Sequence, residues 1–252
     1  MRDLVADARL RVDGINPTDA HRAMGRGDFI ESAPNRTALG LLDDRSRWPG
    51  GRLALIGPAG AGKTHLVHVL MAETGAARVE APMLRADTVP SLVATGCVAV
   101  EDADRLPEAH DPALAEAALF HLLNLAMQER TPILLTGRDA PARWAIALPD
   151  LASRLAALTP VRLAPPDDAL LAALIAKLLG DRQLDFEAGL PDYLAARIER
   201  SFDAAQRVVE RLDAVSFVER RNVNKRLAGD VLAAGEGQMP LPLDASPQNR
   251  HR

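Results

Sequence analysis

The most constraining feature of this sequence is the run Gly-Pro-Ala-Gly-Ala-Gly-Lys-Thr at residues 57–64, which fits the pattern G-x-x-x-x-G-K-[ST]. The apolar run at 53–56 precedes it and a helical pattern at 65–71 follows it. In a loop between a strand and a helix, glycines let successive backbone N–H groups converge on phosphate oxygens, and the helix N-terminus faces the same anion. The alternative, an ordinary glycine-rich turn, is disfavoured by these flanks. The sequence therefore predicts a nucleotide-binding phosphate loop.

Two side chains at the end of this loop carry its chemistry. Lys63 is expected to place its charge on the β- and γ-phosphates, and the Thr64 hydroxyl is expected to ligate Mg²⁺. The predicted nucleotide-binding residues are Gly57, Pro58, Ala59, Gly60, Ala61, Gly62, Lys63, Thr64 and His65.

Composition excludes several other classes of protein. The net charge of −4 gives no electrostatic argument for binding DNA or an acidic membrane surface. A single cysteine, Cys97, excludes a disulfide framework and a cysteine-based metal cluster. We expect neither a signal peptide at the charged N-terminus nor a membrane span, which needs about 20 apolar residues. A cytoplasmic location is therefore expected.

Strands and helices alternate along the first two thirds of the chain, which predicts an α/β fold with a parallel sheet. The expected strands are Leu53–Ile56, Arg78–Glu80, Cys97–Val100, Ile133–Thr136 and Val161–Leu163, and the long helix between the third and fourth of them is Pro112–Glu129. After Pro165 and Pro166 only helices are expected, at Asp168–Leu179, Pro191–Arg200, Ser201–Arg220 and Lys225–Leu232. Residues 233–252 are rich in glycine, proline and polar residues and are expected to form a flexible tail.

Polar residues follow two of the expected strands. Glu101 and Asp102 come after four apolar residues, where phosphate-loop proteins place an acid for Mg²⁺ and often a second acid that polarises water. Glu101 stands where aspartate is usual, and its extra methylene would move the metal. Thr136 ends the next strand, from which its hydroxyl would reach the γ-phosphate. The alternatives are an ordinary polar strand end for the acids and a turn residue for Thr136.

Several motifs occur in an order that resembles the AAA+ module of the DnaA/Hda family of bacterial replication proteins, and most closely its regulatory member Hda. They are Asp28–Asn35, the phosphate loop, Val98–Asp102, Leu134–Asp139 and Leu148–Leu155. The resemblance implies an AAA+ P-loop NTPase core with a five-stranded parallel sheet in an αβα arrangement, followed by a small all-helical lid. It divides the chain into an N-terminal segment (1–27), the core (28–165), the lid (166–232) and the tail (233–252). It also implies ATP or ADP between core and lid, with 28–35 beside the adenine.

The resemblance also assigns roles to individual residues. Glu101 and Asp102 become the acidic pair, with Glu101 and Thr64 as the magnesium ligands, and Thr136 becomes the first sensor. Arg154 falls at the arginine finger, which reaches the γ-phosphate of a neighbouring AAA+ subunit; the planar guanidinium suits phosphate oxygens. The expected catalytic set is therefore Glu101, Asp102, Thr136 and Arg154. A solvated arginine on a short helix is the alternative interpretation of Arg154.

The sequence departs from the family in two places. Where the family's lid contributes an arginine to the nucleotide, the chain has Asp203; either Arg200 or Arg207 substitutes, or the contact is absent and hydrolysis is weak. The C-terminal helix-turn-helix domain of the initiator has no counterpart in the tail, so the chain is not expected to be an initiator. The basic cluster at 220–226 is expected to be a solvated loop.

The tail contains Gln238-Met-Pro-Leu-Pro-Leu243, which resembles the hexapeptide that docks replication proteins on the β sliding clamp of DNA polymerase III. The predicted contact residues are Gln238, Met239, Leu241, Pro242 and Leu243. Prolines hold such a segment extended before binding and so lower the cost of ordering it. A plain proline-containing tail is the alternative.

Two functions remain open at this point. The first is a nucleotide-bound regulator of replication initiation that docks on the sliding clamp and stimulates ATP hydrolysis by DnaA, with DNA contacted only indirectly, no membrane partner, and a homodimer among the assemblies allowed. The second is an ATPase that loads a helicase or moves on single-stranded DNA, which would favour a basic channel with aromatic side chains. Aromatic residues make up only 3% of the chain, which favours the first.

Overall fold

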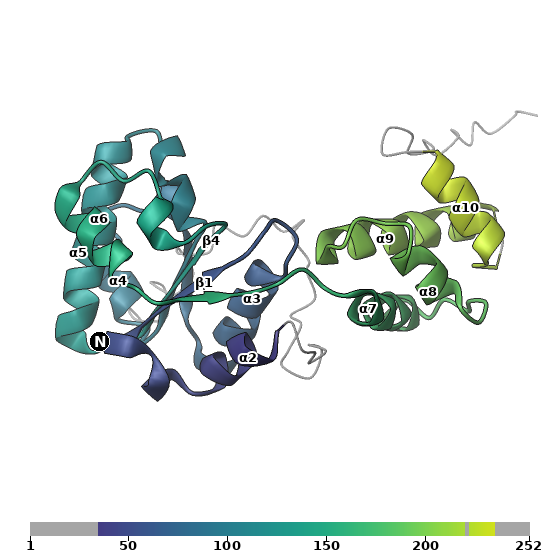
Figure 1. Cartoon of the computed structure of the whole chain (residues 1–252), viewed down its shortest axis with the longest axis horizontal. Helices are drawn as coiled ribbons and strands as arrows, with labels where there is room; N and C mark the ends of the chain where they lie inside the picture. The colour runs from purple at the N-terminus through teal and green to yellow at the C-terminus, as the bar shows by residue number, and fades with distance from the viewer. Residues whose placement is uncertain (1–34, 220–221, 235–252) are drawn as a thin grey trace, which may run out of the picture.

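Five parallel strands form the centre of the computed structural model, which describes residues 35–219 and 222–234 (Figure 1). The strands are β1 (Arg52–Ile56), β2 (Ala77–Glu80), β3 (Val98–Glu101), β4 (Ile133–Gly137) and β5 (Pro160–Arg162). Their order in the sheet is β2-β3-β4-β1-β5, and every pairing is parallel. The predicted α/β fold with a five-stranded parallel sheet is confirmed, and each strand lies within one residue of its predicted bounds.

Helices cover both faces of the sheet. One face carries α2 (Arg36–Asp43) and α3 (Lys63–Thr74), and the other carries α4 (Val89–Val93), α5 (Pro112–Glu129) and α6 (Pro149–Ala156). Strand β3 explains the two cores, because Val98 and Val100 pack with α4, α5 and α6 whereas Ala99 packs on the opposite face. This alternation also decides which polar side chains at the strand ends share the face of α3.

Helix α5 has the bounds that the sequence predicts, because both of its ends are encoded locally. The Asp111 side chain accepts a hydrogen bond from the Leu114 amide at 3.1 Å, and Pro112 occupies the first turn. At the other end Arg130 adopts a left-handed conformation with φ of 56°.

Within the described residues, four helices follow the sheet, and they form a group of their own, which we call the helical bundle (Figure 1). They are α7 (Asp168–Asp181), α8 (Leu190–Ala195), α9 (Phe202–Glu219) and α10 (Lys225–Ala233), and they share a hydrophobic core separate from the two cores of the sheet. Besides these helices, a single parallel bridge joins Phe186 to Val223. The residue boundaries predicted for the domains stay a prediction.

The second helix of the bundle is shorter than predicted. The expected helix Pro191–Arg200 ends at Ala195, and the chain then turns, with the Ser201 amide donating to the Glu199 carbonyl at 2.7 Å. This turn brings the start of α9 against the phosphate loop, a tertiary contact that the helical pattern does not contain. None of the helices in the described ranges has the length and apolar character that a membrane span requires.

Candidate functional site

The phosphate loop connects the end of β1 to α3 and has a backbone that requires glycine. Gly60 and Gly62 have φ of 68° and 93°, in the left-handed region that side chains disfavour. Gly57 is constrained differently, because a Cβ there would lie 2.4 Å from the backbone oxygen of Leu163 beyond β5. Three of the predicted loop residues are thus glycine for identifiable steric reasons.

Lys63, the cation of the loop, points back into it. Its side chain is 7% exposed, and Nζ donates hydrogen bonds to the carbonyl oxygens of Gly57 at 2.8 Å and Pro58 at 2.9 Å. Burial lowers the pKa of Lys63 and the Arg138 guanidinium acts in the same direction, while the carboxylates of Asp102 and Asp104 oppose them. The ammonium group therefore lies near charged side chains of both signs.

The other predicted loop residues lie around this lysine. Thr64 is exposed and His65 is half-buried, both in the first turn of α3, whereas Ala61 is buried. Thr64 is thus accessible to solvent in the first turn after the loop.

The start of α9 is seated directly on the phosphate loop. The Phe202 amide donates to the Gly60 carbonyl at 2.8 Å, and the Phe202 ring lies 3.2 Å from the point where a Cβ on Gly62 would stand. Asp203 follows in the first turn of α9, and its carboxylate partly offsets the lowering of the Lys63 pKa that burial causes. At the position where the resemblance predicts a lid arginine, the helical bundle therefore brings a negative charge toward the loop.

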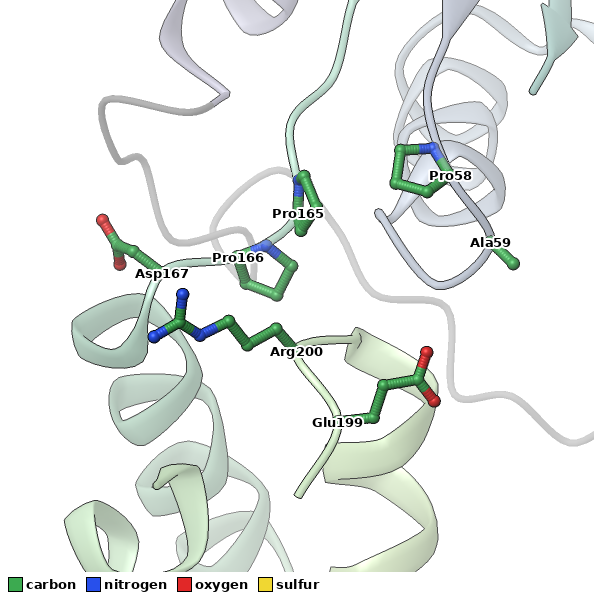
Figure 2. Close-up of a pocket in the computed structure, with 7 residues that line it drawn as sticks. All are labelled: Pro58, Ala59, Pro165, Pro166, Asp167, Glu199 and Arg200. Atoms are coloured by element: carbon green, nitrogen blue, oxygen red, sulfur yellow. The ribbon is translucent and has the colours of Figure 1, made fainter. Parts of the chain in front are cut away.

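A cavity of about 430 Å³ lies between the loop and the helical bundle (Figure 2). Its lining comprises Pro58, Ala59, Pro165, Pro166, Asp167, Glu199 and Arg200. Arg200 forms two contacts of 2.9 Å with the Asp168 carboxylate, through Nε and through a terminal nitrogen. Of the two arginines that the sequence left open as substitutes at Asp203, Arg200 thus lines the cavity beside the loop.

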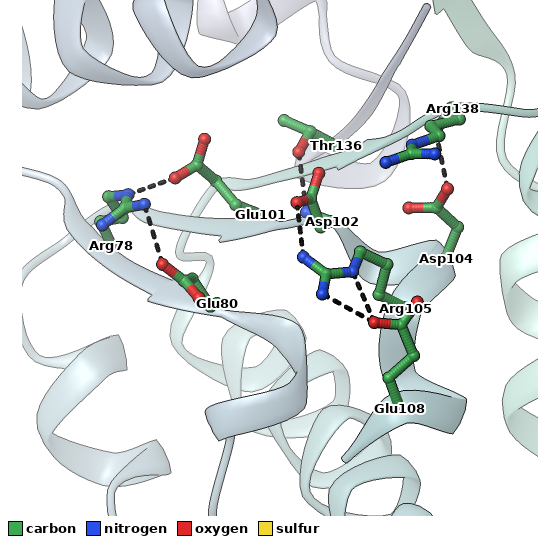
Figure 3. A network of polar contacts seen from close by, with 9 residues as sticks. All are labelled: Arg78, Glu80, Glu101, Asp102, Asp104, Arg105, Glu108, Thr136 and Arg138. Carbon is green, nitrogen blue, oxygen red and sulfur yellow. Dashed lines mark hydrogen bonds and ion pairs between the residues drawn. The ribbon is translucent and has the colours of Figure 1, made fainter. Parts of the chain in front are cut away.

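The acidic pair lies at the end of β3, and an arginine engages each member of it (Figure 3). Glu101 is 3% exposed and forms an ion pair with Arg78 of β2. The Asp102 carboxylate lies 3.5 Å from the Arg105 guanidinium. Glu101 is therefore paired with a cation in a buried place, whereas Asp102 is about 40% exposed and shares Arg105 with Glu108.

Thr136 ties the acidic pair to the neighbouring strand. Its hydroxyl accepts a hydrogen bond from the Asp102 amide at 3.0 Å, and the residue is 1% exposed. Asp102 adopts a left-handed backbone conformation with φ of 51°, which turns the chain at this point. Glu101, Asp102 and Thr136 are thus brought together, as the sequence predicts.

As arranged, these side chains do not fit the predicted magnesium site. Mg²⁺ requires carboxylate oxygens free to approach it to about 2.0–2.1 Å in octahedral geometry, whereas Glu101 and Asp102 face guanidinium groups. Within 35–219 and 222–234 no three histidine, cysteine or acidic side chains are grouped as a metal site would require. In this arrangement Glu101 is therefore not placed to ligate Mg²⁺ directly.

Sequence reasoning missed three residues of this cluster. Arg78 and Arg105 supply the cations, and Asp104 accepts a hydrogen bond from the Arg138 amide through Oδ2 at 3.0 Å. The other oxygen of Asp104 is buried without a hydrogen-bond partner among the described residues. The spacing Asp102-Ala-Asp104 was the available signal for the third acid, whereas nothing in the local sequence of β2 marks Arg78.

Arg154 lies at the opposite end of the sheet. Its guanidinium donates a hydrogen bond to the Asn124 side chain and stands 4.7 Å from the centre of the Phe120 ring, both on α5. Burial and the neighbouring Arg154 lower the pKa of Arg52, the first residue of β1. Four residue steps of a strand span about 13 Å, and the phosphate loop begins only after the last residue of β1. Arg154 is therefore remote from the loop of its own chain.

Residues 53–179 match the AAA domain family, over half of the 252-residue chain. The chain belongs to the AAA domain family. None of the curated proteins compared with it matches. The match begins with β1 and ends in α7, so it contains the phosphate loop, the acidic pair, Thr136 and Arg154.

Solved structures share the fold of this AAA protein. Domain III of the Thermotoga maritima replication initiation protein DnaA superposes with a TM-score of 0.66 at 16% identity, covering 82% of this chain and 95% of that one. The replication initiator DnaA bound to AMPPCP and single-stranded DNA gives 0.61 at 17% identity, covering 82% and 70%. The Thermotoga maritima RuvB Holliday junction branch migration motor gives 0.61 at 18%, covering 83% and 71%. At these identities the likeness establishes the AAA+ fold, and the closer assignment to Hda stays a prediction.

Other predictions concern residues outside the described ranges. They are the N-terminal segment 1–27, residues 28–34 of the expected adenine contact, the basic residues 220–221, and the tail motif Gln238–Leu243. Asn35, the last residue of the expected adenine contact, is buried and directly precedes α2.

Proposed function

We propose that this AAA protein binds ADP or ATP and regulates the initiation of chromosomal replication, by docking on the β sliding clamp and promoting ATP hydrolysis by the initiator DnaA. The single observation that carries the proposal is the separation of Arg154 from the phosphate loop of its own chain. An arginine held at the far end of the sheet is suited to a phosphate that belongs to another subunit.

The nucleotide part of the proposal is supported by the loop itself. Gly60 and Gly62 turn the backbone, and Lys63 is held at the loop by two carbonyl oxygens that an incoming phosphate would replace. The shared fold with a DnaA structure bound to AMPPCP supports an adenine nucleotide. In this function Thr136 and Asp102 would lie beside the terminal phosphate, joined by their hydrogen bond.

The regulatory part is supported by how Arg154 is held. The contacts with Asn124 and Phe120 hold the half-buried guanidinium of Arg154 against α5, which would lower the entropy cost of ordering it for a partner. An arginine supplied in trans to a transferring phosphoryl group is worth roughly 10³-fold or more in rate. The AAA+ fold shared with DnaA, together with the sequence resemblance, supports DnaA as that partner.

The clamp part rests on the sequence of the tail. Gln238–Leu243 resembles the docking hexapeptide, and Pro240 and Pro242 favour an extended segment. A short peptide of this kind gives weak affinity by itself, so a homodimer would strengthen docking on a ring with several equivalent pockets.

A single-turnover assay tests the proposal. It measures hydrolysis of DnaA-bound ATP in the presence of the sliding clamp and DNA, with and without this chain. The wild type should accelerate hydrolysis, and Arg154→Ala should remove the acceleration while melting temperature and nucleotide affinity stay nearly unchanged. Arg143→Ala is the matched control, because Arg143 is an exposed arginine close to α6 whose nearest acid, Asp139, is 3.9 Å away. Equal acceleration by wild type and Arg154→Ala would exclude Arg154 as the arginine finger for the ATP bound to DnaA.

A motor that acts on single-stranded DNA is the second candidate, and the fold shared with the RuvB branch migration motor favours it. The two candidates differ in what they capture. A regulator should retain the sliding clamp in a pull-down, whereas a motor should retain single-stranded DNA and should hydrolyse ATP faster when that DNA is added.

A further inference from the structure

Arg78 is the cation that neutralises Glu101 (Figure 3). It projects from β2, the edge strand of the sheet, and its side chain is 33% exposed, whereas the Glu101 side chain is 4% exposed. A second, weaker contact of 3.3 Å joins Arg78 to Glu80. Of the two carboxylates that Arg78 contacts, that of Glu101 is more deeply buried than that of Glu80. Glu101 therefore relies more on Arg78 for neutralisation of its charge.

The register of the sheet fixes this pair. Arg78 is the parallel partner of Ala99, and Glu101 lies two residues further along β3 on the same face. Val98 and Val100 point to the opposite face, where they belong to the core under α4, α5 and α6. A change of register between β2 and β3 that separated Arg78 from Glu101 would therefore also misplace two buried valines.

The length of Glu101 makes the contact feasible. Phosphate-loop proteins commonly place an aspartate at this strand end to hold Mg²⁺, and glutamate extends the carboxylate by one methylene. Here the longer side chain reaches sideways to the neighbouring strand, where Arg78 meets it. A guanidinium stays charged at all physiological pH values, so this cation is permanent.

We infer that Arg78 replaces a divalent metal at Glu101, so that the chain binds nucleotide without using Glu101 as a metal ligand. The inference rests on the proposed binding of nucleotide at the phosphate loop. A metal that approached Glu101 would first have to displace Arg78 and would then be repelled by it, because both are cations in a poorly solvated place.

The test compares nucleotide affinity in Mg²⁺ with nucleotide affinity in EDTA, by calorimetric titration of the full chain with ADP and with ATP. The ratio of the two affinities should be the same for wild type and Glu101→Gln. In Arg78→Gln the buried carboxylate loses its cation, and we expect the ratio to rise about tenfold, the lower end of the effect of outer-shell residues on metal affinity. Combining Arg78→Gln with Glu101→Gln should abolish the rise.

Two further variants guard against a merely structural effect. Glu80→Gln removes the exposed partner of Arg78 and leaves the pair with Glu101, so its ratio should match wild type. Glu101→Asp shortens the acid and withdraws it from Arg78 without removing either charge, so its ratio should rise, by less than in Arg78→Gln because the charge of Arg78 remains nearby. If Arg78→Gln fails to fold, Glu101→Asp still tests whether Arg78 keeps the metal away from residue 101.

Each outcome has a definite meaning. If Glu101→Gln alone lowers the Mg²⁺ ratio of the otherwise native chain, Glu101 is a metal ligand and the inference is wrong. If neither wild type nor any variant binds nucleotide, the proposed function fails. The melting temperatures of the nucleotide-free proteins, with and without Mg²⁺, then test whether Arg78 keeps the metal away from Glu101. Mg²⁺ should then raise the melting temperature of Arg78→Gln and not of wild type; equal responses would overturn the inference.

Discussion

Replacing Gly60 by alanine tests whether α9 is seated on the phosphate loop. A Cβ at Gly60 would lie 2.3 Å from the Cβ of Ser201, far inside the optimal carbon–carbon separation of about 3.5–4.0 Å. Gly60 also has a φ of 68°, which an alanine adopts only with strain. The substitution therefore has two separable costs, one steric and one conformational.

Their magnitudes follow from the geometry. The left-handed conformation costs an alanine about 1–2 kcal/mol. Relieving the clash requires α9 to move away from the loop by about 1 Å or more, which breaks the hydrogen bond from the Phe202 amide to the Gly60 carbonyl and loses about 1–2 kcal/mol with its packing. Gly60→Ala should thus lower the free energy of unfolding by about 2–4 kcal/mol in all.

A double-mutant cycle with Ser201→Gly separates the two costs. Ser201→Gly removes the clashing Cβ, and because its hydroxyl caps the Ala204 amide at 3.1 Å, replacement by glycine should itself cost only a few tenths of a kcal/mol. In that background Gly60→Ala should cost only the conformational part. Urea unfolding of the full chain measures each variant through the fluorescence of Trp48 and Trp144, both buried against the sheet. Additive effects of the two substitutions would refute the contact between α9 and the loop.

Three further predictions concern other parts of the chain. The isolated protein should hydrolyse ATP poorly, because Arg78 engages Glu101 and because the resemblance predicts an arginine where the first turn of α9 has Asp203. A turnover near one per second, normal for phosphoryl transfer, would contradict this. Deleting residues 236–252 should abolish binding to the sliding clamp in a pull-down while the melting temperature of the remaining chain is retained, and unchanged clamp affinity would make the tail motif a coincidence. Glu116→Ala should lower the free energy of unfolding by about 2–4 kcal/mol in urea, because the buried carboxylate accepts hydrogen bonds from the amides before α6 at 3.0 and 2.7 Å. Glu116→Gln keeps one acceptor oxygen and should lose less.

Elements whose ends are encoded locally could be predicted from the sequence. Strand β3 is a short run of buried residues, and α5 carries its own cap and first-turn proline, so both were found within one residue. The end of α8 could not be predicted, because the chain there turns to meet Gly60, a residue more than a hundred positions earlier. The pattern of apolar residues carries no information about such a contact.

The candidate site also contains some residues that the sequence alone could identify and others that it could not. The loop glycines and Lys63 could be predicted because their spacing along the chain follows the phosphate-loop pattern, and the acidic pair because it directly follows a run of buried apolar residues. Arg78 was missed because its role depends on the register between β2 and β3, which brings it to Glu101 from a separate strand. Its presence turns a predicted magnesium ligand into one half of an ion pair.

The positions of Lys63 and Arg154 constrain any assembly with another AAA+ subunit. Lys63 lies beyond the last residue of β1, whereas Arg154 lies beside the first, so a contact that brings Arg154 to a partner's phosphate joins two different surfaces. Such a contact is head-to-tail and leaves the phosphate loop of this chain outside it. We therefore expect Arg154→Ala to remove stimulation of DnaA without changing nucleotide affinity, and Lys63→Ala to remove nucleotide binding while the guanidinium stays in place. Calorimetry and the hydrolysis assay on both variants measure this separation. Loss of nucleotide binding in Arg154→Ala would contradict this expectation, because it would show that Arg154 and the phosphate loop of the same chain are coupled despite their separation.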